Sequence, residues 1–127
     1  MIKATRNQMA NISNPYQGNS RKVLCVCSAG CLRSPTLANV LHKELGYNTR
    51  ACGSAESFAL IPITEALIHW ADEIIFVDED CKTYLDTETK EELSLAKARL
   101  VTLNVPDDYA YGEEVLEKEL LMQYLLT

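Results

Sequence analysis

Short apolar runs alternate along this chain with longer segments whose apolar residues recur every three or four positions. Runs of four to eight mostly apolar residues are typical of β-strands, and the helical spacing is typical of helices packed on a sheet. The runs that predict strands span 23–27, 47–52, 73–78 and 100–105. The first, Val23–Cys27, is apolar throughout, so we expect it to be buried on both faces.

The segment after the first run carries the signals of a helix start. Ser34 is expected to be the N-cap and Pro35 the first helical residue, where its missing N–H costs nothing. Gly46 predicts the end of this helix. Its buried face is predicted to consist of Leu37, Val40, Leu41 and Leu45.

Further helices are predicted later in the chain. Thr64 is expected to cap one, the stretch from Glu79 to about Arg99 to hold one or two, and Glu113 to begin the last. The residues predicted to face the core are Leu67, Ile68 and Ala71 in the first of these helices, and Val115, Leu116, Leu120 and Tyr124 in the last.

This alternation predicts an α/β fold with three layers, α/β/α, around a four-stranded parallel sheet. Right-handed crossovers and short connections favour the strand order 2-1-3-4. In that order the sheet changes direction beside strand 1, and ligands of open α/β sheets bind at such a point. We therefore expect one domain over residues 21–127, with its binding loop directly after strand 1, and a flexible or extended arm over residues 1–20.

Charge is distributed unevenly. The net charge is −6, but the first 22 residues carry four basic residues and no acidic one, so the remainder carries −10. A body this acidic argues against nucleic acid or a membrane surface as a partner. Five cysteines, an odd number without a secretion signal, favour reduced thiols and a cytoplasmic location.

The predicted turn after strand 1 has the composition of an anion-binding loop. It runs from Cys27 to Arg33 through Ser28, Ala29, Gly30, Cys31 and Leu32. Backbone N–H groups of such a loop, together with the following helix N-terminus, can converge on one phosphate. Arg33 can bind two phosphate oxygens at once, and the same positive field favours a thiolate at Cys27. Ser34 is expected to donate a hydrogen bond to that thiolate as well as to cap the helix.

A proton donor is expected on the loop after the fourth strand. Asp107 and Asp108 follow Pro106 there, at the edge of the sheet where Cys27 should also lie. Either carboxyl group could protonate an alkoxide or phenoxide that leaves phosphorus. Tyr109 is expected to contribute to the wall of the binding cleft.

These segments resemble the low-molecular-weight protein tyrosine phosphatases. Val23–Cys27, the Arg33-Ser34-Pro35-Thr36 segment and Pro106–Tyr109 carry the resemblance, which is closest to a short bacterial branch of predicted phosphatases and spans Lys22 to the C-terminus. It implies hydrolysis of phosphate monoesters, with phosphotyrosine as the expected substrate, through a cysteinyl-phosphate.

The resemblance also implies a set of residue roles. Cys27 would be the nucleophile, Arg33 the phosphate clamp, Ser34 the hydroxyl that tunes the thiolate and Asp107 the general acid, with Asp108 as the alternative acid. Residues 28–32 and Tyr109 would contact the substrate. No metal or other cofactor is expected, and phosphate, sulfate or vanadate should bind in the loop.

This chain departs from the family pattern inside the loop. Gly30 stands where the family has an asparagine that pins the loop, so the loop must be pinned differently or be looser. Cys31 lies one position away from the family's second loop cysteine, yet it remains a possible redox partner of Cys27.

Two other functions remain open. The chain could be an arsenate reductase of the same fold with Cys81 as a relay thiol, or a catalytically weak phosphate-binding or regulatory protein. A zinc module is disfavoured because Cys25 should point into the core and no Cys-x2-Cys pair follows. The two histidines, His42 and His69, are expected to be surface or packing residues on helices.

Overall fold

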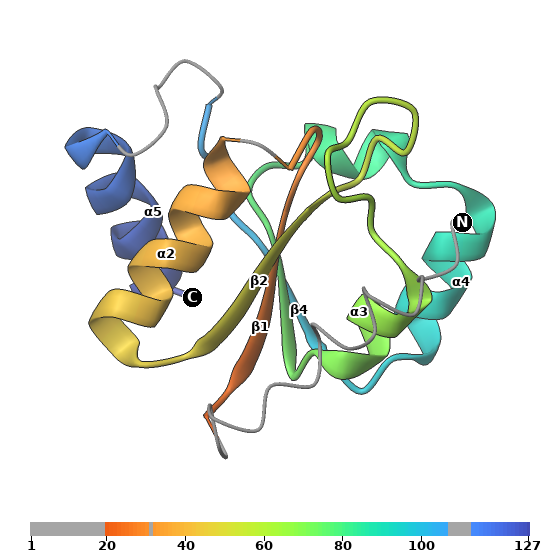
Figure 1. The fold of residues 1–127 in the computed structure, drawn as a ribbon, viewed down its shortest axis with the longest axis horizontal. Coiled ribbons are helices and arrows are strands. Elements are labelled where there is room, and N and C mark those ends of the chain that lie inside the picture. The colour runs from red at the N-terminus through yellow and green to blue at the C-terminus, as the bar shows by residue number, and fades with distance from the viewer. Residues whose placement is uncertain (1–19, 31, 107–112) are drawn as a thin grey trace.

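Four parallel strands form the centre of the computed structural model, which describes residues 20–30, 32–106 and 113–127 (Figure 1). The strands are β1 (Lys22–Cys27), β2 (Asn48–Gly53), β3 (Glu73–Phe76) and β4 (Arg99–Thr102). Their order across the sheet is β2-β1-β3-β4, and each neighbouring pair is parallel. The predicted fold class and strand order are therefore confirmed.

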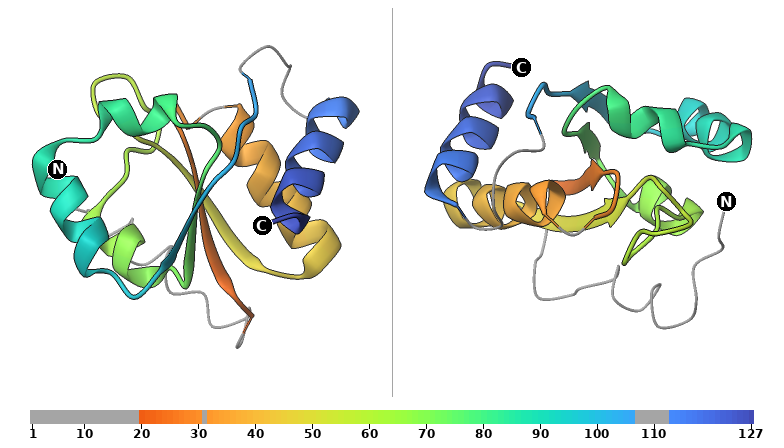
Figure 2. Two further views of the ribbon diagram at one scale, coloured as in Figure 1. Left: turned by 180° about the vertical axis from the view of Figure 1, so that it is seen from behind. Right: turned by 90° about the horizontal axis from the view of Figure 1, so that it is seen from above.

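Helices cover both faces of the sheet. The α-helices are α2 (Arg33–Leu45), α3 (Glu65–Trp70), α4 (Thr87–Leu95) and α5 (Glu114–Leu125), and a 3-10 helix, η2, spans Asp80–Tyr84. Figure 2 shows α2 and α5 together on one side of the sheet, with α3 and α4 on the other. Among the described residues, no helix is both long enough and apolar enough to cross a membrane.

Strand β1 lies at the centre of the core, as its apolar sequence predicts. Val23, Cys25 and Cys27 face the cluster formed with α2 and α5, whereas Leu24 and Val26 face the cluster formed with α3 and α4. All five residues are 3% exposed or less. Cys27 thus ends a rigid strand that is held on both sides.

The start of α2 differs from the prediction. Leu32, not Ser34, is the N-cap, and the Leu32 carbonyl accepts hydrogen bonds from both the backbone N–H and the hydroxyl of Thr36. Pro35 still lies in the first turn, where a missing N–H is tolerated. The Ser34 hydroxyl therefore does not cap the helix and can form hydrogen bonds with other groups. By contrast, Thr64 caps α3 and Gly46 ends α2 in a left-handed conformation, as predicted.

Two predicted core residues are exposed instead. Val115 is 56% exposed because it lies outside the buried stripe of α5, which consists of Leu116, Leu120 and Tyr124. Leu45, at the last position of α2, is 37% exposed. The buried faces of both helices are thus narrower than their sequences indicate.

Strands β3 and β4 are also shorter than predicted, ending at Phe76 and Thr102. Isolated backbone hydrogen bonds nevertheless continue along the same path: Val77 N–H donates to the Val26 carbonyl at 3.0 Å, and Val105 N–H donates to the Val77 carbonyl at 3.0 Å. The chain therefore remains anchored up to the loop that was predicted to carry the acid.

Candidate active site

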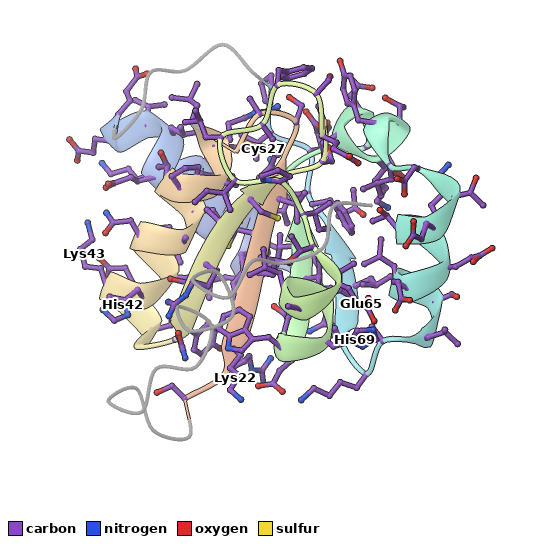
Figure 3. All side chains as sticks on the ribbon, turned by 45° about the vertical axis from the view of Figure 1, so that its right-hand side comes forward. Lys22, Cys27, His42, Lys43, Glu65 and His69 are labelled. Carbon is purple, nitrogen blue, oxygen red and sulfur yellow. The ribbon has the colours of Figure 1, made fainter. Side chains whose placement is uncertain are left out.

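Cys27 lies at the carboxyl end of β1, and β1 begins at Lys22 at the opposite end of the sheet (Figure 3). Arg33 opens α2 on the same edge as Cys27, and Asp78 follows β3 there. Because the carboxyl ends of parallel strands share one edge, the ends of β1 and β3, which are distant in sequence, lie at the edge where α2 begins.

The chain curls around the Cys27 sulfur. The Gly30 backbone N–H donates to Cys27 Sγ at 3.1 Å, and Ser34 Oγ lies 3.1 Å from the same sulfur. Ser34 Oγ also donates to the Cys52 carbonyl at 3.2 Å. Both groups that contact the sulfur can donate a hydrogen bond, so they can stabilise a negative charge on it.

Gly30 is required by the shape of this loop. Its φ is +72°, in the left-handed region that other residues rarely adopt. A Cβ at this position would lie 2.7 Å from the Gly53 nitrogen and 2.8 Å from the Cys52 carbonyl carbon. The absence of a side chain thus permits both the turn and its close contact with the end of β2.

The segment after β2 holds the loop in place. Ala55 N–H donates to the Ser28 carbonyl at 2.9 Å, and Leu60 N–H donates to the Ala29 carbonyl at 3.1 Å. With two of its carbonyls bound from outside, the loop is fixed by a neighbouring segment and does not depend on an asparagine of its own. This explains how Gly30 is accommodated at that position.

Arg33 is held at the edge of this loop with only 4% of its surface exposed. Its Nη1 forms an ion pair with Asp78 and donates to the Val105 carbonyl at 2.8 Å. The guanidinium thus connects the start of α2 to the ends of β3 and β4. Asp78 also accepts the Cys81 N–H at 2.8 Å, which fixes its carboxylate.

The pKa of Asp78 lies below its ordinary value. Burial alone would raise it, but the hydrogen bonds from Arg33 and from the Cys81 backbone outweigh that effect. Asp78 is therefore a carboxylate at neutral pH, and it positions Arg33 without serving as a proton donor. Asp78 belongs to no recognisable sequence motif, although its place at the end of the predicted third strand is a signal that it lies at this edge.

Several predicted site residues lie outside the described residues, namely Cys31, Asp107, Asp108 and Tyr109. The proposed arm over residues 1–20 also lies outside them, apart from Ser20. Leu32, the N-cap of α2, is half-buried, and Ser28 and Ala29 are half-buried next to it. Val105, two residues before Asp107, lies against Arg33.

The other described cysteines, Cys25, Cys52 and Cys81, are free and buried. Burial raises the pKa of all three, and for Cys81 to about 12. Cys81 Sγ lies 3.1 Å from the Asp78 carbonyl and donates to it. These thiols stay protonated at neutral pH, which argues against Cys81 as a redox relay.

Comparison with solved structures finds the same fold elsewhere. The structure of Wzb from Vibrio vulnificus in complex with benzylphosphonate superposes with a TM-score of 0.54 at 19% sequence identity, over 85% of this chain and 92% of that one. No family model and no curated protein matches the sequence. At this identity the likeness establishes the fold, which is the one that the sequence resemblance implied.

Proposed function

We propose that this protein hydrolyses phosphate monoesters through a cysteinyl-phosphate formed on Cys27. The observation that carries the proposal is the double contact to the Cys27 sulfur, from the Gly30 N–H and the Ser34 hydroxyl, at the start of a helix whose first residue is Arg33. A sulfur that receives hydrogen bonds at a helix N-terminus is suited to be a thiolate nucleophile.

In the first step the Cys27 thiolate attacks phosphorus, so that an S–P bond forms as the bond to the leaving oxygen breaks. Asp107 transfers its proton to that oxygen, with Asp108 as the alternative donor. Loop N–H groups and Arg33 stabilise the equatorial phosphoryl oxygens. In the second step water attacks phosphorus, the S–P bond breaks and the proton of the water returns to the carboxylate.

Asp78 and the Val105 carbonyl prepare Arg33 for this role. Asp78 and the Val105 carbonyl both bind Nη1, which leaves the orientation of the guanidinium fixed before substrate arrives. Preorganised charge of this kind stabilises a transition state without reorganising at the moment of reaction.

Aryl phosphates, including phosphotyrosine, are the substrate class that the surroundings favour. Phe58 and Tyr84 are 54% and 51% exposed. Their rings pack edge to face, with the ring centroids 5.7 Å apart. Phe58 belongs to the segment that binds the loop through Leu60. The ligand of the Wzb structure, benzylphosphonate, likewise joins an aromatic ring to a phosphonate.

Hydrolysis of p-nitrophenyl phosphate in the presence of a chelator tests the proposal. Wild type should turn over without added metal, and Cys27→Ser should lose about 10³-fold or more of kcat. The variant should keep its circular dichroism spectrum and still bind vanadate or phosphate. Turnover that survives in Cys27→Ser would rule out the mechanism. Arsenate turnover with a thiol donor, run alongside, should be absent because Cys81 is buried.

A further inference from the structure

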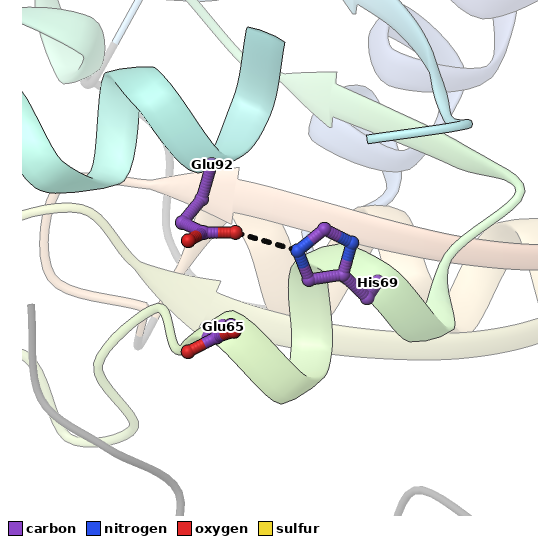
Figure 4. A group of neighbouring side chains, drawn as sticks. All are labelled: Glu65, His69 and Glu92. Atoms are coloured by element: carbon purple, nitrogen blue, oxygen red, sulfur yellow. Dashed lines mark hydrogen bonds and ion pairs between the residues drawn. The ribbon is translucent and has the colours of Figure 1, made fainter. Parts of the chain in front are cut away.

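A histidine and two glutamates from two helices come together away from the Cys27 loop. Glu65 and His69 lie four residues apart on α3, and Glu92 lies on α4. One oxygen of each carboxylate and one ring nitrogen of His69 all lie within 4.8 Å of one another. Figure 4 shows the His69 ring directed at Glu92, with Glu65 on the preceding turn of the same helix.

We propose that Glu65, His69 and Glu92 bind a zinc ion that joins α3 to α4. Imidazole nitrogen and carboxylate oxygen are both ordinary zinc ligands, and three protein ligands leave one position for water. The spacing of Glu65 and His69 by four residues places both on one face of a helix, which is a common way for a helix to supply two ligands.

The geometry requires only small side-chain movements. Bonds of 2.0–2.2 Å in a tetrahedral site put ligand atoms about 3.4 Å apart. His69 Nε2 and Glu92 Oε2 are now 2.6 Å apart and would separate, while Glu65 would move closer. The side chains of His69 and Glu92 are 43% and 23% exposed, so they have room to rotate.

The local charge also favours a cation. Two carboxylates face one imidazole, and within the described part of the chain neither Glu65 nor Glu92 forms a salt bridge with a lysine or an arginine. A divalent ion would neutralise both carboxylates while His69 coordinates in its neutral form. This environment differs from that of the Cys27 loop, where the ligand is an anion.

The site is structural, and hydrolysis does not depend on it. Figure 3 places Glu65 and His69 on the outer layer, well separated from Cys27. Zinc should therefore raise the melting temperature by binding the folded state alone. The proposal stands or falls separately from the phosphatase mechanism, which should run in chelator.

Zinc titration of the untagged full chain by calorimetry tests the proposal, with Cys27→Ser as the background so that the reactive thiol does not bind the ion. We expect one zinc per chain and a matching rise in melting temperature. His69→Gln and Glu92→Gln should each weaken binding by about tenfold or more. Because these side chains are on the surface, both variants should fold normally without metal, which circular dichroism checks.

His42→Gln is the matched control. His42 is the only other histidine of the chain, lies on α2 and contacts the Tyr47 carbonyl at 2.9 Å. This variant should bind zinc with the same affinity as the Cys27→Ser background. The proposal is overturned if zinc does not bind below millimolar concentration, or if binding is unchanged in both His69→Gln and Glu92→Gln.

Discussion

The Ser34 hydroxyl has one hydrogen and two partners. It lies 3.1 Å from Cys27 Sγ and donates to the Cys52 carbonyl at 3.2 Å. While Cys27 is a neutral thiol, the sulfur can donate to Ser34 and the hydroxyl can donate to Cys52. When the thiol ionises, the hydroxyl hydrogen has to turn to the sulfur. We propose that Ser34 is a positioning residue whose hydrogen bond follows the charge of Cys27.

Removing this hydroxyl should slow the reaction. A hydrogen bond to a charged group contributes about 1.5–3 kcal/mol, so Ser34→Ala should lower kcat for p-nitrophenyl phosphate by about 10- to 150-fold. The rate at which iodoacetamide alkylates Cys27 near pH 6 should fall as well. Ser94→Ala, which removes an exposed hydroxyl on α4, is the control and should change neither rate. An unchanged alkylation rate in Ser34→Ala would show that the hydroxyl does not stabilise the thiolate.

Gly30 and Gly46 form a natural pair for testing the shape of the loop. Their φ values are +72° and +71°, but a Cβ on Gly46 would meet no atom within 4 Å, whereas on Gly30 it would collide with the end of β2. Gly46→Ala should therefore lower the free energy of unfolding only by the left-handed strain, about 1–2 kcal/mol. Gly30→Ala should lower it further and abolish turnover. Urea denaturation and kcat measure the two effects; equal stability losses would contradict the close contact.

At the scale of elements, the Arg33–Asp78 ion pair connects α2 to the end of β3. Breaking a buried pair by removing one partner costs about 3 kcal/mol, so Asp78→Asn should lose about that much stability at neutral pH. The pKa of Asp78 is lowered in the folded state. The stabilisation is therefore complete above the unfolded value of about 3.9 and disappears as the pH falls through the folded value.

The measurement is urea denaturation of wild type and Asp78→Asn between neutral pH and pH 3. The stability difference between them should shrink below about pH 4. Glu79→Gln is the control, because Glu79 pairs with Lys82 at the surface and should lose only about 0–1 kcal/mol. A difference that stays constant with pH would mean that Asp78 does not carry the charge in this pair.

The segment between β2 and α3 has two functions in this account. Its backbone holds the loop through Ala55 and Leu60, and its Phe58 ring packs against Tyr84. Aromatic pairing contributes about 0.5–1.5 kcal/mol, so Phe58→Ala should lower kcat/KM for aryl phosphates by about three- to tenfold and change it little for alkyl phosphates. Leu95→Ala, an exposed residue on α4, is the control. An equal loss for both substrate classes would contradict selection by the ring.

At the scale of the whole molecule, the topology follows from the sequence alone. Alternating strand and helix patterns, together with the handedness of parallel crossovers, determine the order 2-1-3-4 and place the loop after β1 at the edge where open α/β sheets generally bind ligands. The errors concern ends of elements. Ser34 was expected to cap α2, but the N-cap is Leu32, whose carbonyl accepts a hydrogen bond from the Thr36 hydroxyl. No sequence pattern predicts this contact.

The site was predictable only in part. The sequence selects Cys27 and Arg33 by their spacing, but it does not reveal what holds them, because those partners are distant in the chain. Asp78 binds Arg33 from 45 residues away, and the segment after β2 holds the loop through backbone groups, which any residue would supply. Interactions that depend on the backbone leave no trace in side-chain composition.

Direct detection of the phosphorylated cysteine tests the central claim. Wild type is mixed with p-nitrophenyl phosphate, and the reaction is quenched within one turnover. The protein is then digested, and the mass of the peptide that contains Cys27 is measured by mass spectrometry. We predict an added phosphoryl group on that peptide, bound through sulfur, and none in Cys27→Ser. Nitrophenol release by wild type with Cys27 unmodified throughout the time course would contradict the account.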